Sequence, residues 1–309
     1  MTLVEPQTAG CPVSGERWVR TSLRGLAKAR NHRACPTTLG RLLRANGLGL
    51  RGHRKRLTRK THADRDTQFR YIQSQRRAFV GGHNPRISID AKKREKVGVF
   101  KNAGRRWCRQ PTDVNAHDFP TDAVAQAVPY GVYDPELNRG HVCVGTSGNT
   151  ADLAVDAVRD WWRQKGKGQY CDATALLIEA DGGGSNGATS RRFKFRLQQF
   201  ADETGLAVTV CHYPPGASKW NPIEHKLFSQ ITATWAGIVL ATVALLVGLI
   251  RRTTTASGLK VTARLMPGEY PTGRKVTTAE FNAIRLTRHK TCPQWNYTIH
   301  PRTGGKNTE

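Results

Sequence analysis

The chain has 309 residues, 38% of them hydrophobic and 23% charged, and this ordinary composition predicts a globular protein long enough for two units. Its 49 Lys and Arg outnumber its 23 Asp and Glu, for a formal net charge of +26, and the first 86 residues hold 19 basic against 4 acidic side chains. This charge indicates a nucleic-acid partner, and the large sheet-forming remainder argues against a small ribosomal-type RNA binder. Seven cysteines without Cys-x-x-Cys spacing argue against a disulfide framework and a zinc site, as is typical of the reducing cytosol.

Near the amino terminus the sequence predicts two short helices joined by a turn, over 22–30 and 36–47. Three leucines at helical spacing give the second helix an apolar stripe: Leu39, Leu42 and Leu43. Thr37 or Thr38 is expected to cap the start of this helix, and Gly47 is expected to end it.

Two basic side chains of the second helix, Arg41 and Arg44, lie off this stripe and are available to DNA phosphates or base edges. The helix pair is therefore similar to a helix-turn-helix whose second helix enters the major groove. A small basic helical hairpin with another role is an equally open alternative. Residues 1–50 are accordingly expected to form a small basic all-α, helix-turn-helix-like region that binds DNA.

Residues 51–84 are expected to be a basic linker. The segment contains the run Arg54, Lys55 and Arg56, and more basic pairs follow as far as 76–77. Such runs are commonly solvated surface. Beside a DNA-reading helix pair, contact with phosphates is the stronger interpretation.

After residue 85 the pattern alternates between strands and helices. Strands are predicted over 86–90, 97–100, 141–145, 175–180 and 207–211, and helices over 150–165, over 190–203 and from Pro222 onward. The run at 175–180 is apolar almost throughout, which indicates a central strand buried on both faces. This order predicts an α/β protein with a ribonuclease-H-like mixed sheet flanked by helices over 85–302, followed by a polar tail at 303–309.

An uncharged stretch at 231–250 needs a membrane check, because ~20 apolar residues are enough to span a bilayer. Trp235 and Gly237 are expected to break it into two shorter helices, and polar sequence of globular type follows. A buried helix is therefore favoured over a membrane anchor, and no stable membrane association is expected.

Three carboxylates occupy places where such a sheet builds an active site. Asp90 ends the first predicted strand, Asp181 follows the central strand, and Glu224 lies in the first turn of the helix that begins at Pro222. Phosphodiester chemistry uses hard divalent cations, which prefer oxygen ligands and often act in pairs. Together the three acids predict a metal centre that acts on a polyanion.

Each acid also has a structural explanation. Asp90 fits a surface acid before a basic turn, and Asp181 fits an Asp-Gly turn. Asn221, Pro222 and Glu224 fit a capping box at the start of a helix. Their joint placement favours the catalytic interpretation, because the predicted topology brings the three positions to one edge of the sheet.

Two features beside Asp181 were open to other interpretations. Glu179 lies one pleat back on the same face of the strand, where a role beside the metal and a purely structural partner are equally open. Gly182 and Gly187 are spaced as in a P-loop, but Ala188 stands where a P-loop requires Lys. The sequence therefore argues against nucleotide hydrolysis.

Several long motifs carry a family resemblance. They are residues 181–186 (DGGGSN), 211–225 (CHYPPGASKWNPIEH) and 292–299 (CPQWNYTI), with supporting matches at 85–90 (PRISID), 142–146 (VCVGT) and 268–275 (GEYPTGRK). Over about residues 3–302 the chain resembles the bacterial insertion-sequence DDE transposases of the IS-Azo-thirteen family.

This resemblance implies a DNA transposase in which Asp90, Asp181 and Glu224 are the catalytic acids and hold two Mg²⁺ ions, with Mn²⁺ as an alternative. The implied activity is phosphodiester hydrolysis at insertion-sequence ends and strand transfer into target DNA. The implied partner is double-stranded DNA, bound by a homo-oligomer in the bacterial cytoplasm at the nucleoid. The expected DNA contacts are Arg41, Arg44, Arg54, Lys55, Arg56, Lys219, Arg274 and Lys275.

The sequence also departs from the family pattern. Its amino-terminal region is shorter than is usual, and residues 236–250 are more apolar than expected. A truncated, catalytically inactive remnant that only binds DNA is therefore the alternative function. A structure-specific nuclease on the same fold is a third.

Overall fold

The computed structural model describes residues 8–10, 17–19, 22–28, 35–50 and 62–302. Their contacts divide the chain into two units, Met1–Leu57 and Thr58–Glu309. Three of the expected DNA contacts, Arg54, Lys55 and Arg56, lie outside the described residues, as does the tail at 303–309.

The first unit combines a short hairpin with the two predicted helices. β1 (Thr8–Gly10) pairs antiparallel with β2 (Arg17–Val19), and α1 (Leu23–Lys28) and α2 (Pro36–Ala45) follow. The sequence pattern predicts the helices but not the hairpin, because its three-residue strands are too short for a period to show.

The ends of α2 agree with prediction only in part. Gly47 follows the helix at φ +77, a conformation that glycine adopts readily, so it ends the helix as predicted. The N-cap residue is Cys35, and its side chain makes no capping hydrogen bond. The cap predicted at Thr37 or Thr38 is wrong, because the helix begins at Pro36 and encloses both threonines.

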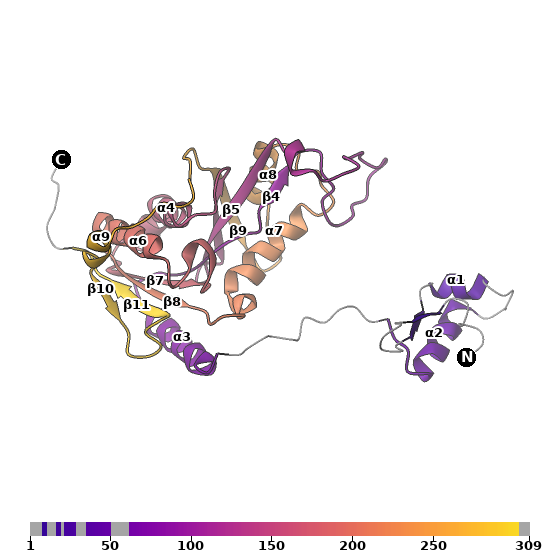
Figure 1. Cartoon of the computed structure of the whole chain (residues 1–309), viewed down its shortest axis with the longest axis horizontal. Helices are drawn as coiled ribbons and strands as arrows, with labels where there is room; N and C mark the ends of the chain where they lie inside the picture. The colour runs from indigo at the N-terminus through magenta and orange to yellow at the C-terminus, as the bar shows by residue number, and fades with distance from the viewer. Residues whose placement is uncertain (1–7, 11–16, 20–21, 29–34, 51–61, 303–309) are drawn as a thin grey trace. The chain divides into compact units, whose positions relative to one another are not determined.

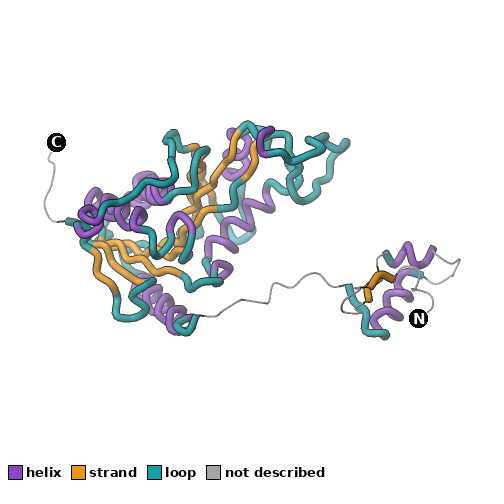
Figure 2. The backbone as a smooth tube through the Cα atoms, viewed as in Figure 1, coloured by secondary structure: helices purple, strands orange, loops and turns teal. Residues whose placement is uncertain are grey.

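The second unit is built on one mixed sheet with helices on both faces (Figure 1, Figure 2). Its strand order is β10-β11-β8-β7-β3-β5-β6-β9, and β4 pairs with β5 outside this order. The strands are β3 (Arg86–Ala91), β4 (Glu95–Val97), β5 (Ala125–Asp134), β6 (Arg139–Gly145), β7 (Ala175–Ala180), β8 (Ala207–His212), β9 (Lys260–Leu265), β10 (Leu286–Arg288) and β11 (Asn296–Ile299). Three antiparallel strands (β6, β5, β3) continue into two parallel ones (β7, β8), which confirms the predicted ribonuclease-H-like sheet.

Four of the five predicted strands are confirmed as β3, β6, β7 and β8. The strand predicted at 97–100 is wrong in position, because β4 ends at Val97 and Gly98 follows at φ +148. The ten-residue strand β5 is missing from the prediction, since Pro129 and Gly131 interrupt its apolar run.

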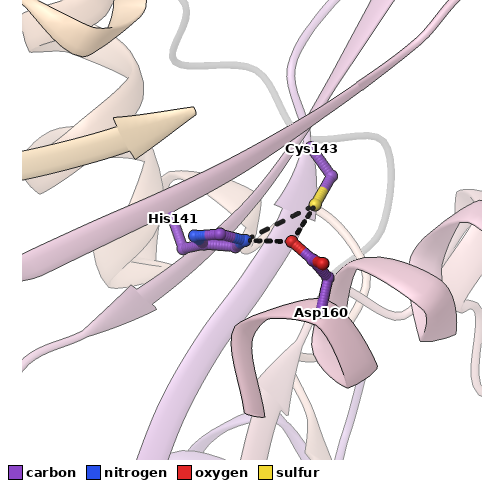
Figure 3. A group of neighbouring side chains, drawn as sticks. All are labelled: His141, Cys143 and Asp160. Carbon is purple, nitrogen blue, oxygen red and sulfur yellow. Dashed lines mark hydrogen bonds and ion pairs between the residues drawn. The ribbon is translucent and has the colours of Figure 1, made fainter. Parts of the chain in front are cut away.

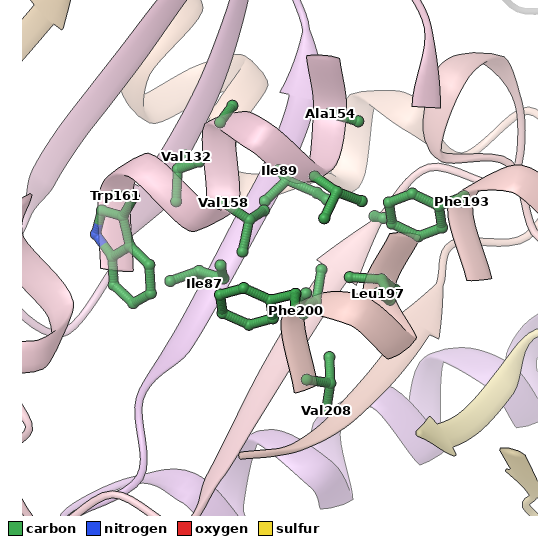
Figure 4. Close-up of a cluster of buried hydrophobic side chains, with 14 of the residues drawn as sticks. Ile87, Ile89, Val132, Ala154, Val158, Trp161, Phe193, Leu197, Phe200 and Val208 are labelled. Carbon is green, nitrogen blue, oxygen red and sulfur yellow. The ribbon is translucent and has the colours of Figure 1, made fainter. Parts of the chain in front are cut away.

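Helices α4 (Ala151–Trp161) and α6 (Arg191–Thr204) lie side by side on one face of the sheet (Figure 1). Each begins at a residue whose hydroxyl accepts a backbone N–H, Thr150 for α4 and Ser190 for α6. Figure 4 shows the apolar core beneath them, which includes Ile87, Ile89, Val132, Val158, Phe193, Leu197, Phe200 and Val208. Both helices confirm the prediction.

The π-helix η6 (Glu224–Phe228), α7 (Ser229–Thr234) and α8 (Val243–Arg251) cover β5, β6 and β9 on the opposite face. A Cβ atom on Gly131 of β5 would lie 2.7 Å from the Phe228 ring, and one on Gly140 of β6 would lie 2.5 Å from Leu227 Cδ1. The two glycines therefore allow η6, which carries Glu224, to pack directly on the sheet.

Helix α3 (Arg65–Phe79) forms within the segment expected as a linker. Ile72 is 2% exposed, and Gln68 Nε2 donates to His212 O and to Asn296 Oδ1, both at 2.8 Å. One helix face is thus buried against the sheet. The sequence does not predict this helix, because polar side chains such as Gln68 occupy part of its buried face and interrupt the apolar period.

The remaining short elements connect these layers. They are the π-helix η3 (Trp162–Gly166), α5 (Lys167–Gln169), α9 (Thr278–Asn282) and the 3₁₀ turns η2 (Pro120–Asp122), η4 (Gly184–Asn186) and η5 (Ser218–Trp220).

The uncharged stretch at 231–250 is divided between α7 and α8, as predicted. The chain turns at Trp235, which is 2% exposed, and at Gly237, which has φ +69. Within the residues described, no helix combines the length and the apolarity needed to cross a membrane.

Candidate active site

The structure brings Asp90, Asp181 and Glu224 to one end of the sheet. β3 and β7 are adjacent and parallel, with Ile89 opposite Ala180, so Asp90 and Asp181 are neighbours where these strands end. Glu224 comes from η6, which packs on the same face. All three side chains are half-buried, so they combine a dry environment with access from solvent.

Crowding of negative charge at this site changes the acidity of its groups. Burial and the charges of Asp181 and Glu224 raise the pKa of Asp90 to about 8, although the Ala91 N–H donates to its Oδ1 at 2.8 Å. Burial and the charge of Glu224 also raise the pKa of Asp181, while a hydrogen bond from Asn221 opposes the rise. The ionised forms of Asp90 and Asp181 are therefore unfavourable at this site without a positive partner.

Asn221 links the elements that carry the three acids. Its Nδ2 donates to Asp181 Oδ1 at 3.1 Å and to Ile89 O at 3.2 Å, and its Oδ1 accepts from the Ser88 hydroxyl. The residue is fully buried. Asn221 therefore does not form the capping box that its sequence fits. Its side chain is hydrogen-bonded to β3 and Asp181, and the Glu224 N–H donates to its backbone oxygen instead.

The backbone of Asp181 is fixed by two buried side chains, those of His212 and Asn186. Asp181 O accepts from His212 Nδ1 at 3.0 Å and from Asn186 Nδ2 at 3.3 Å. Burial lowers the pKa of His212 to about 4, so the ring is neutral, with its proton on Nδ1. The Tyr130 hydroxyl donates to Asn186 Oδ1 at 3.2 Å, which also holds the glycine turn after Asp181.

A cleft of about 540 Å³ opens over Asp90 and Asp181. The glycine turn at 182–184 forms one wall, and Trp295 lies on the lining. Asn149 also lines the cleft, and its buried Oδ1 has no hydrogen-bond partner in the part of the chain described. An unpaired buried acceptor in a residue of the cleft lining is suited to a bound water molecule.

Glu179 has a structural partner. Arg76 of α3 forms two hydrogen bonds with its carboxylate, with Nε to Oε1 at 2.7 Å, and the Tyr213 hydroxyl donates to Oε2 at 2.6 Å. Glu179 is 1% exposed, so this pairing is what allows it to be buried as an anion. The same contact occupies Arg76, which lies in the basic run expected to contact phosphates.

The described basic residues expected to contact DNA lie on the surface of their units. Arg41 and Arg44 are exposed on α2, where Leu39 is 8% and Leu42 is 52% exposed, so the leucine stripe is only partly buried. Lys219 is exposed on η5. Arg274 and Lys275 are exposed in the loop that precedes α9.

The donor set of the three acids fits hard divalent cations, since it consists of carboxylate oxygens with an amide oxygen nearby. Among residues that the structure describes, the group of three ligand atoms all within 4.8 Å of one another is His141, Cys143 and Asp160, and not the three acids.

Solved structures similar to the chain include two complexes of Mos1 transposase. The paired-end complex with the left transposon end has a TM-score of 0.45 and 11% identity, covering 74% of this chain and 64% of that chain. The Mos1 mariner paired-end complex with Mn has a TM-score of 0.44 and 12% identity over the same shares. The chain thus spans about 64% of the length of these proteins.

No curated protein matches the chain. The family described as the Rhodopirellula transposase DDE domain matches residues 1–301, which is nearly the whole sequence. The chain belongs to this DDE transposase family.

Proposed function

We propose that the chain cuts DNA at the ends of an insertion sequence and joins the freed ends to target DNA, using two divalent metal ions held by Asp90, Asp181 and Glu224. One observation carries the proposal: three half-buried carboxylates from β3, the end of β7 and η6 converge, and burial together with the charges of the other two acids raises the pKa of Asp90 to about 8. Such an arrangement is unfavourable without cations and is what a two-metal phosphodiester site requires.

In this proposal Asp90 and Asp181 hold Mg²⁺ or Mn²⁺, and Glu224 completes the shell of the second ion. When bound, such ions activate a water molecule or a DNA 3′ hydroxyl for attack and stabilise the leaving oxygen. Asn221 orients the Asp181 carboxylate, and Asn186 and His212 fix its backbone. These contacts keep Asp181 aligned with Asp90 before DNA arrives.

Exposed positive charge supports DNA as the substrate. Lys219 lies in η5, immediately before the helical turn that carries Glu224, and the His225 ring contacts its backbone oxygen. A groove of about 710 Å³ on the unit is lined in part by His225 and Lys226, the two exposed residues that follow Glu224. Basic side chains beside the acids neutralise phosphates and fix the DNA register, and α2 supplies further basic side chains.

The proposal is tested with the purified protein and a plasmid that carries the gene's own flanking DNA. Asp90→Asn, Asp181→Asn and Glu224→Gln are each expected to abolish Mg²⁺-dependent nicking and end joining. DNA binding, measured by mobility shift, is expected to persist because none of these residues is basic. Asp66→Asn, an exposed acid in the first turn of α3, is the matched control and is expected to cut normally.

Each alternative has its own outcome in the same experiment. Retained DNA binding with no cutting by the wild-type protein indicates the inactive DNA-binding remnant. Cutting of branched DNA without end joining indicates a structure-specific nuclease. Normal cutting by any one of the three acid variants removes that residue from the metal centre.

A further inference from the structure

A second group of potential metal ligands lies between β6 and α4, on the face of the sheet opposite the three acids. His141 and Cys143 are two residues apart on β6, so their side chains leave the same face. Asp160 projects toward them from α4 (Figure 3). His141 Nε2 lies 2.8 Å from Asp160 Oδ2, and Cys143 Sγ lies 3.6 Å from each of these atoms.

These separations are close to those of a tetrahedral zinc site. With ordinary zinc–ligand bond lengths, sulfur lies about 3.6 Å from a nitrogen or oxygen ligand, and nitrogen lies about 3.4 Å from oxygen. Both distances from Cys143 Sγ already match. The distance between His141 and Asp160 has to open by about 0.6 Å, a small rotation for the Asp160 side chain, which is 14% exposed.

Outer contacts hold two of the ligands in a suitable orientation. His141 Nδ1 lies 2.8 Å from the Thr262 hydroxyl, which is itself within 3.4 Å of Gly140 O. Because Thr262 donates to Gly140 O, His141 Nδ1 is the donor to Thr262, and its Nε2 is directed at the Asp160 oxygen. A cation, either a proton on Nε2 or a metal ion, must lie between Nε2 and this oxygen. Arg264 holds the other oxygen of Asp160, with Nη1 to Oδ1 at 2.9 Å.

Space for a fourth ligand adjoins the cluster. A cavity of about 170 Å³ is lined by His141, Thr262, Trp161 and Lys260, and it is large enough for several water molecules. Three protein ligands with one open position are a common zinc arrangement. Imidazole and thiolate also select a softer cation than the Mg²⁺ suited to carboxylates.

We infer that His141, Cys143 and Asp160 bind one zinc ion, with water from the adjoining cavity as fourth ligand. The ion links β6 to α4 across the sheet–helix interface and is independent of the three-acid centre. The absence of Cys-x-x-Cys spacing in the sequence is therefore no obstacle to a zinc site here. Two of these ligands lie two residues apart on a strand, and the third comes from the following helix.

The test is a titration of the metal-free full-length protein with Co²⁺, followed by visible absorption. One Co²⁺ per chain is expected to give the d–d bands of a tetrahedral ion with a thiolate-to-cobalt charge-transfer band, and Zn²⁺ is expected to remove both. Cys143→Ser is expected to abolish the charge-transfer band. Cys211→Ser, which alters another fully buried strand cysteine, is the matched control and is expected to retain it.

Two further variants keep the test decisive if Cys143→Ser does not fold by circular dichroism. Asp160→Asn and His141→Gln are each expected to weaken Co²⁺ binding at least about tenfold, as loss of a ligand does. Asp181→Asn is expected to leave the charge-transfer band unchanged, which separates this site from the carboxylate centre. Absence of a thiolate band in the wild-type protein, or an equal band in folded Cys143→Ser, overturns the inference in favour of a plain His141–Asp160 ion pair.

Discussion

Replacing Asn221 by alanine tests whether this buried amide assembles the site. The change removes three hydrogen bonds, to the Asp181 carboxylate, to Ile89 O and from the Ser88 hydroxyl. A hydrogen bond to a charged group contributes about 1.5–3 kcal/mol and a neutral one about 0.5–1.5 kcal/mol. Asn221→Ala is therefore expected to lower the free energy of unfolding by about 2.5–6 kcal/mol, measured by urea denaturation with an unchanged m value.

The same variant is expected to lose metal affinity as well as stability. Without the Nδ2 donor, Asp181 is free to rotate away from Asp90, and loss of such an orienting contact costs about 10–100-fold in metal affinity. The assay is Mn²⁺ binding in buffer without urea, at a temperature at which circular dichroism shows the variant to be folded.

Asn84→Ala is the matched control, because Asn84 Oδ1 accepts from the Thr174 and Ala175 N–H groups, both at 2.9 Å, at the opposite end of β7. It is expected to lose stability but to bind Mn²⁺ normally. If Asn221→Ala binds Mn²⁺ as tightly as the wild-type protein, the positioning role of Asn221 is refuted.

Three further predictions follow from the site and its supports. Gly131→Ala is expected to reduce DNA cleavage and to destabilise the fold by about 1–3 kcal/mol, because the added Cβ would lie 2.7 Å from the Phe228 ring. Gly248→Ala, in the open part of α8, is expected to do neither. Equal cleavage and equal urea midpoints for the two variants would contradict the close approach of Phe228 to Gly131. Glu179→Gln is expected to cost about 3–5 kcal/mol of stability, because it breaks a buried ion pair with Arg76. The Mg²⁺ concentration for half-maximal cleavage is expected to stay unchanged, and a shift in this concentration would give Glu179 a role at the metal. Burial and the neighbouring acids raise the pKa of Asp90 to about 8 in the folded protein, so its ionisation opposes folding. Stability in EDTA is therefore expected to fall between about pH 4 and pH 8 by more in the wild type than in Asp90→Asn, and Mg²⁺ is expected to restore it. Parallel pH profiles for the two proteins would exclude this raised pKa.

The sequence predicts the centre of the sheet and the convergence of the three carboxylates at its end, because the sequence patterns on which both rest are local. The apolar run before Asp181 indicates a buried strand, and the predicted order of elements then places Asp90 and Glu224 at the same edge of the sheet. Both β7 and the flanking helices α4 and α6 follow from period and caps alone.

The features that escape the sequence depend on contacts between distant segments. Pro129 and Gly131 interrupt the strand pattern of β5 in the sequence. In the structure Gly131 leaves room for η6 to pack on the sheet. Asn221 fits a capping box in the sequence, and only the position of β3 shows that its side chain is used elsewhere. Helix α3 lacks a clear apolar pattern because its buried face includes the polar residue Gln68, which is hydrogen-bonded to Asn296.

The most direct test of the central claim is the number of Mn²⁺ ions bound per chain, measured by electron paramagnetic resonance, since it requires no knowledge of the DNA sequence. The wild-type protein is expected to bind about two ions at saturation, as a two-metal phosphodiester site requires. Asp181→Asn, which changes one of the three acids, is expected to lose both. Undiminished Mn²⁺ binding by folded Asp181→Asn would contradict the claim that these carboxylates form the metal centre.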